Sequence, residues 1–138
     1  MIAKNTAKSG AIDVIYISLL RRQRWRFVIH RQSGLNHHDF EIVSASSLPD
    51  LLVRLLDCLS PIHSNFIEKL DHLDNERLQK SSHRTTRYFD ARFAPEWRRC
   101  LPRTIGINEA RAISGLACDA AGIACRSFNL PLANVLAQ

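Results

Sequence analysis

Residues 24–31 carry the pattern that most limits how this chain can fold. Apolar side chains at Trp25, Phe27 and Ile29 alternate with a second set that is largely basic. That second set is Arg24, Arg26, Val28 and His30. Because successive side chains of a β-strand point to opposite faces of the sheet, the alternation predicts a half-buried strand with one apolar face and one basic face.

Two neighbouring segments complete a small sheet with this strand. Residues 12–20 are rich in β-branched side chains, and residues 39–44 again alternate between apolar and polar positions. Short polar links join both segments to residues 24–31, which favours antiparallel pairing. We therefore expect a three-stranded antiparallel sheet.

The apolar residues of the third segment indicate which face of that sheet is buried. Phe40 and Ile42 are two residues apart, so they lie on the same side of their strand. We expect them to join Trp25 and Phe27 on one apolar face, since a single buried face fixes how strands align.

A stripe of leucines follows and predicts the helix that covers this face. Ser47 is a suitable N-cap, and Pro49 lies in the first turn, where a missing amide is harmless. The stripe consists of Leu51, Leu52, Leu55, Leu56 and Leu59. This spacing is typical of one side of an α-helix, so residues 47–59 should form an amphipathic helix on the sheet.

The second half of the chain predicts helices alone. Ser60-Pro61 can begin a helix with an acidic outer side, and Asn108 can cap a helix of small residues that stops at Gly122. A last short helix should follow around Pro131. A helix-turn-helix would place Pro131 inside its recognition helix, which disfavours that motif.

Together these patterns predict an α+β fold: a small three-stranded antiparallel sheet packed by helices, then an all-helical C-terminal half. The length of 138 residues suits one domain. Within it we expect residues 1–10 to be mobile, residues 11–60 to form the sheet and its covering helix, and residues 61–138 to be helical.

The charge of the chain favours anionic partners. There are 19 Lys and Arg residues against 13 Asp and Glu residues, a formal net charge of +6, and fifteen of the basic residues are arginines. The helix expected from residue 61 is acidic and could pair with a basic segment of this chain or of another copy. The small-residue helix at 109–121 also suits a homodimer interface.

Two segments, 21–31 and 83–103, combine arginines with aromatic residues. We expect a partner to be contacted by Arg21, Arg22, Arg24, Arg26, Arg84, Arg87, Arg92, Arg98, Arg99 and Arg103. Tyr88 and Phe89 should anchor a short helix to the core. If Trp25, Tyr88 and Trp97 are buried too, they cannot stack on bases, and only the arginines remain as contacts.

The sequence contains no specific catalytic or metal-binding motif. The sequence has no glycine-rich phosphate loop and no nucleophile elbow. His37 and His38 are adjacent, so on a strand they point to opposite sides, and the cysteines have no zinc-finger spacing. We therefore expect no metal, no cofactor and no catalytic residues. A metal-independent nuclease remains the weaker alternative, with His30, His37, His38, His83 and Glu96 as its available parts.

The sequence thus predicts a non-enzymatic basic binding protein that contacts nucleic acid, or a nucleic-acid-processing protein, through arginine patches. The alternative is an inhibitor or adaptor that binds a partner protein, such as a small regulator encoded by a mobile element. No run of residues has transmembrane length, and the cysteines have no disulfide-scaffold pattern, so a cytoplasmic location is expected.

Overall fold

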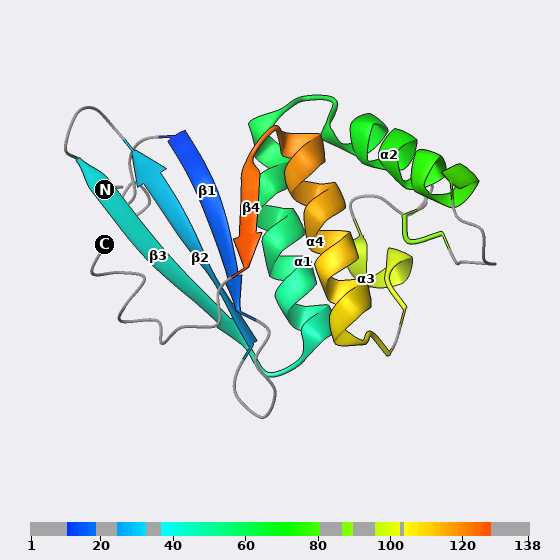
Figure 1. Cartoon of the computed structure of the whole chain (residues 1–138), viewed down its shortest axis with the longest axis horizontal. Helices are drawn as coiled ribbons and strands as arrows, with labels where there is room; N and C mark the ends of the chain where they lie inside the picture. Colours follow the sequence, from blue (N-terminus) through cyan, green and yellow to red (C-terminus); the bar gives the residue numbers. More distant parts are fainter. Residues whose placement is uncertain are drawn as a thin grey trace.

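Four strands form one mixed sheet, and the helices pack on one of its faces (Figure 1). The strands are β1 (Ala11–Ser18), β2 (Trp25–Gln32), β3 (His38–Ala45) and β4 (Ala124–Ser127). The helices are α1 (Leu48–Leu59), the 3-10 turn η2 (Ser60–Ile62), α2 (Phe66–Lys80), α3 (Trp97–Cys100) and α4 (Ile107–Ala121). This computed structural model describes residues 11–18, 25–32, 37–80, 87–89, 96–102 and 104–127, and for residues 98, 99 and 127 it describes the backbone only.

The predicted antiparallel meander is confirmed, but the all-helical second half was wrong. β1 pairs antiparallel with β2, and β2 pairs antiparallel with β3. After α4 the chain forms β4, which pairs in parallel with β1 and gives the order β3-β2-β1-β4. Two parallel strands can be joined only by a long crossover connection. The residues next to β4 in the sequence therefore do not indicate that it pairs with β1. A strand after α4 also rules out the helix-turn-helix outline.

The face assigned to the third strand was also wrong. Directly paired residues of neighbouring strands lie on the same face, and the register pairs Phe40 with His30 and Ile42 with Val28. Phe27 is instead paired with Val43. A shift of one residue in register exchanges the two faces of a strand. The sequence of the link between β2 and β3 did not show which of the two registers, and so which face, was correct. The more apolar side of β3 therefore faces away from the helices.

The predicted covering helix is confirmed as α1. The Ser47 hydroxyl accepts a hydrogen bond from the Asp50 amide at 3.2 Å, which caps the first turn. All five leucines of the predicted stripe are buried, together with Leu48. They form one core with Ile15 and Phe27 of the sheet. Burying a leucine contributes roughly 1.5–3 kcal/mol, so this stripe is the main attachment of helix to sheet.

α2 and α4 differ from prediction mainly at their ends, and the last short helix predicted around Pro131 lies outside the described residues. Ser60-Pro61 begins only the turn η2, and α2 starts later, at Phe66. α4 is capped by Gly106, whose amide donates to the Glu109 side chain at 3.3 Å, and not by Asn108. α4 ends as predicted at Gly122, which has φ 72°.

The small residues of α4 are packed inside this chain. Ala110, Ala117 and Ala121 are buried, and α4 contacts both α1 and α2. A homodimer through this helix would therefore have to use its exposed side, where Arg111 and Asp119 lie. None of the described helices has the length and apolar character needed to cross a membrane.

Candidate functional site

The face of the sheet turned away from the helices, called the outer face below, can be read from the strand register. Its paired rows are Ser18–Arg26–Ser44, Tyr16–Val28–Ile42 and Val14–His30–Phe40. Arg126 of β4 pairs with Tyr16 and so belongs to the same face. Val14 and Val28 are buried, whereas Ile42 is 45% exposed. The outer face is therefore accessible along the two edge strands, at Ile42 of β3 and at Arg126 of β4, whereas its middle is buried.

A β-bulge in β1 brings an acidic side chain to this face. The pairing of β1 with β2 shifts between Ile12 and Val14, which leaves Asp13 as the extra residue. The Oδ2 atom of Asp13 lies 3.1 Å from Nδ1 of His30, the residue paired with Val14. The side chain of His30 is only 12% exposed, so the carboxylate fixes the orientation of a largely enclosed imidazole ring.

Three rings stand in a row beside this carboxylate, and we call His38, His30 and Phe40 the ring row. His30 is the middle ring: its centroid lies 5.1 Å from that of His38 and 4.9 Å from that of Phe40, with interplanar angles of 15° and 25°. Nε2 of His30 is 2.9 Å from Nδ1 of His38. His30 and His38 meet edge to edge through these nitrogens, and His38 is exposed at the sheet edge, so a planar ligand can approach the face of its ring.

The proton positions in the ring row follow from its partners. A carboxylate only accepts hydrogen bonds, so Nδ1 of His30 carries the proton that Asp13 accepts. In neutral His30 the Nε2 atom is then an acceptor, and Nδ1–H of His38 donates to it. The arrangement leaves Nε2 of His38, on the exposed ring, available to a ligand.

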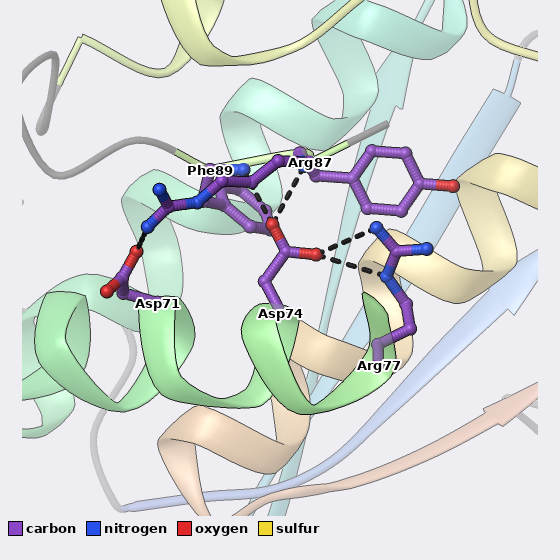
Figure 2. A network of polar contacts seen from close by, with 6 residues as sticks. Asp71, Asp74, Arg77, Arg87 and Phe89 are labelled. Carbon is purple, nitrogen blue, oxygen red and sulfur yellow. Dashed lines mark hydrogen bonds and ion pairs between the residues drawn. The ribbon is translucent and has the colours of Figure 1, made fainter. Parts of the chain in front are cut away.

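A second polar cluster lies on the opposite side of the molecule and has a structural role. Asp74 of α2 is fully buried, and its Oδ2 atom accepts the backbone amides of Tyr88 at 2.8 Å and Phe89 at 2.9 Å (Figure 2). Its Oδ1 atom accepts Nε and Nη2 of Arg77 at 3.0 and 2.9 Å. The Arg77 guanidinium also lies 4.2 Å from the ring centroid of Tyr88. These bonds attach residues 87–89 to α2.

The attachment of residues 87–89 to α2 bears on which side chains of the predicted arginine and aromatic segment, 83–103, can contact a partner. Residues 87–89 are not helical, against expectation, because two of their amides donate to Asp74. Tyr88 and Trp97 are buried, at 7% and 3% exposure, so neither can stack on bases. Arg87 forms an ion pair with Asp71, so the acidic helix does contact the basic segment within this chain (Figure 2).

The structure places only some of the predicted contact residues. Arg26 lies on the outer face, half-buried, and Trp25 is half-buried against the core. Arg98 and Arg99 belong to α3, where only their backbone is described. The others, Arg21, Arg22, Arg24, Arg84, Arg92 and Arg103, lie outside the described residues.

The parts named for a nuclease are only partly brought together. His30 and His38 meet in the ring row, whereas Nε2 of His37 lies 3.7 Å from Oδ2 of Asp39. Glu96 is exposed beside α3, and His83 is outside the described residues. Among the residues that the structure describes, no group of three or more His, Cys, Asp or Glu side chains could hold a metal ion.

Two thiols meet where α4 passes into β4. The side chains of Cys118 and Cys125 share a hydrogen bond, which raises the pKa of Cys118, and burial raises it further. The same hydrogen bond lowers the pKa of Cys125, against a smaller opposing effect of burial. Cys118 is fully buried and Cys125 is exposed. Cys125 is therefore the thiol with both the thiolate character and the access needed for reaction.

A cavity of about 350 Å³ opens where the end of α1 meets the sheet. Apolar side chains such as Ile12 and Ile123 line it, together with Arg31 and Cys58. Nη2 of Arg31 lies 3.4 Å from Oε1 of Glu41. Burial, and secondarily the charge of Glu41, raises the pKa of the Cys58 thiol, so that thiol is poorly suited to act as a nucleophile.

The roles of Asp13 and Asp74, which hold these two clusters together, were hard to predict from the sequence. Asp13 sits inside an apolar strand pattern and gains its partner only through a bulge and a strand register. Asp74 belongs to the acidic side of α2, so its position in the sequence suggests an exposed residue. Its partners, the amides of Tyr88 and Phe89, come from a later segment that has no helical pattern of its own. A lone acid interrupting the apolar run at Asp13 was the one available signal.

No protein-family model matches this chain, and it matches neither a curated protein nor a solved structure.

Proposed function

We propose that this chain is a non-enzymatic binding protein that holds single-stranded nucleic acid on the outer face of its sheet along β3. The observation that carries the proposal is the direction of β3: Phe40 and Ile42, its larger apolar residues, face away from the helices. A sequence whose apolar side is turned from its own core breaks the usual pattern, and such departures concentrate at functional sites. Here that side also carries the ring row.

The ring row supports a nucleobase as the ligand. Bases stack on aromatic and imidazole rings, and stacking contributes roughly 1–3 kcal/mol per base in single-strand binding proteins. His38 is the exposed end of the row, and His30 behind it is held by Asp13. Sheets that use their open face in this way are a recurrent solution for single-stranded RNA.

Two arginines on the same face support contacts with the phosphate groups of a nucleic acid. Arg26 of β2 and Arg126 of β4 both lie on the outer face, on either side of β1. Arginine binds phosphate through a planar fork of donors. The predicted contacts Arg21, Arg22 and Arg24 immediately precede β2 in the sequence and stay part of this proposal, as does a cytoplasmic location, which the free cysteines support.

Fluorescence anisotropy of labelled single-stranded RNA and DNA, measured from low to high salt, tests the proposal. Phe40→Leu keeps an apolar side chain but removes the ring, and should weaken binding roughly 5- to 10-fold. Arg26→Gln or Arg126→Gln should reduce the slope of log affinity against log salt by about 0.7 each. Arg111→Gln, an exposed position on α4, is the matched control and should change neither. No binding at the lowest salt, or equal effects of all three arginines, would refute the proposal.

A protein partner is the second candidate, favoured by the exposure of Ile42 on an edge strand. An eight-residue edge strand with an exposed apolar side chain can accept an added strand from a partner, as in inhibitors and adaptors that bind by β-augmentation. A purified partner whose binding is lost in Ile42→Lys but kept in Arg26→Gln would support this candidate. Nucleic-acid binding predicts loss in Arg26→Gln.

A further inference from the structure

We propose that Cys118 and Cys125 form an oxidation site, at which a peroxide converts the two thiols into a reversible intramolecular disulfide. Both cysteines are free in this structure, and their side chains share a hydrogen bond. The proposal does not depend on nucleic-acid binding, because it rests only on how α4 and β4 are placed.

The turn between α4 and β4 brings the two cysteines together. Gly122 reverses the chain in a left-handed conformation, and the amide of Ile123 donates to the carbonyl of Cys118 at 2.9 Å. β4 then runs back beside α4 and contacts it (Figure 1). The last turn of the helix, which carries Cys118, therefore faces the strand that carries Cys125.

The register of β4 turns Cys125 toward the helix layer. Cys125 is paired with Ile15, a core residue, and directly paired residues of neighbouring strands share a face. Arg126 is paired with Tyr16 and so lies on the outer face. Cys118 belongs to the core cluster and is fully buried. The two thiols thus point toward one another between helix and sheet, as a disulfide requires.

The surroundings of the two thiols give them different roles. Cys125 lies on an edge strand and is exposed, so a dissolved peroxide can reach its sulfur. The hydrogen bond from Cys118 lowers the pKa of Cys125, which favours the thiolate that attacks peroxide. Burial separates Cys118 from solvent, so its reaction partner is the neighbouring sulfur. Cys125 is therefore the peroxide-reactive thiol, and Cys118 is the resolving thiol.

The reaction has two balanced steps. The Cys125 thiolate attacks hydrogen peroxide: an S–O bond forms, the O–O bond breaks, and hydroxide leaves and is protonated, so that Cys125 becomes a sulfenic acid. The Cys118 sulfur then attacks the Cys125 sulfur: an S–S bond forms, the S–O bond breaks, and the leaving hydroxide takes the Cys118 proton to form water. In sum, two thiols and one peroxide give one disulfide and two waters.

Mass spectrometry of the full-length, reduced protein after treatment with hydrogen peroxide tests the proposal. Trypsin cleaves after Arg111 and Arg126, and no Lys or Arg lies between them, so one peptide carries both cysteines. We expect this peptide to become two hydrogens lighter, to resist iodoacetamide, and to recover both thiols after dithiothreitol. Cys58, whose pKa is raised by burial, should oxidise roughly 10-fold more slowly.

Substitutions separate the roles of the two thiols. In Cys118→Ala the sulfenic acid of Cys125 has no resolving partner, so its trapping by dimedone should rise roughly 10-fold over the wild type. In Cys125→Ala the buried Cys118 should stay reduced. Cys58→Ala is the matched control and should form the disulfide at the wild-type rate.

Three results would overturn the proposal. The first is a wild-type peptide whose two cysteines both remain open to alkylation, or that only gains oxygen atoms which dithiothreitol does not remove. The second is equally fast disulfide formation in urea-unfolded protein, because the fold would then not be what brings the thiols together. The third is dimedone labelling of Cys118 in Cys125→Ala, which would contradict the assigned roles.

Discussion

The buried carboxylate of Asp74 accepts the backbone amide of Phe89 at 2.9 Å and so attaches a non-helical segment to α2. Asp74→Asn removes the charge that balances Arg77 and leaves at least one of its four hydrogen-bond donors without an acceptor. Removing one partner of a buried ion pair costs about 3–5 kcal/mol, so we expect a loss of about 3 kcal/mol in the free energy of unfolding. Urea unfolding followed by circular dichroism measures it.

Asp71→Asn is the control for this substitution. Asp71 pairs with Arg87 on the same helix face, but both side chains are partly exposed, so the loss should stay below about 1 kcal/mol. Equal effects of the two substitutions would mean that the Asp74 cluster does not hold residues 87–89 in place.

The fold was predictable wherever one short segment determined its own structure. The leucine stripe specified α1 because helical spacing and an N-cap at Ser47 are local properties. β4 was missed because its stabilising partner, β1, lies at the other end of the chain. The same limit applies to the face of β3, which depends on how β2 and β3 align and not on the composition of either strand.

Gly122 and Gly115 should respond to alanine with opposite signs. Gly122 has φ 72°, a conformation that a side chain disfavours, although a Cβ there would meet only His63 at 3.8 Å. Gly122→Ala should therefore cost about 1 kcal/mol of stability. Gly115 lies inside α4, and a Cβ added there would have no neighbour within 4 Å, so Gly115→Ala should gain up to about 1 kcal/mol through helix propensity. Thermal unfolding of both variants checks the signs, and two changes of the same sign would contradict the assigned end of α4.

Cys125 should be the fastest-reacting of the described thiols near neutral pH. The hydrogen bond from Cys118 lowers the pKa of Cys125, so its thiolate, the reactive form, is present at lower pH than for an ordinary cysteine. Cys118→Ala removes that bond, so the pKa of Cys125 should rise and its alkylation profile should shift to higher pH. Iodoacetamide labelling across a pH series, read by mass spectrometry, measures both.

Cys58 provides the internal comparison for this labelling. Burial raises the pKa of its thiol, so it should react slowly in the wild type and in Cys118→Ala alike. If Cys125 reacts no faster than Cys58, or if its profile is unchanged in Cys118→Ala, the thiol pair does not influence reactivity.

The candidate site was less predictable than the fold, because its parts meet only through tertiary pairing. His30 and His38 were visible as histidines, but their contact required the register of β2 with β3. Asp13 required a bulge as well. Trp97 lies among arginines in the sequence, which left its exposure open, and it is buried because Phe66 and Phe89 pack against it in edge-to-face contacts.

The direction of β3 can be tested by placing the same residue on each of its faces. Ile42 points outward and is 45% exposed, whereas Val43 pairs with Phe27 and packs against the core. Threonine retains the β-branched shape that strands favour. Ile42→Thr should therefore change stability by no more than about 0.5 kcal/mol, while Val43→Thr places a hydroxyl against the core at a half-buried position and should cost about 1 kcal/mol or more. Urea unfolding of the pair measures the difference, and if the larger loss fell at Ile42, the apolar side of β3 would face the helices and the outer-face site would lose its basis.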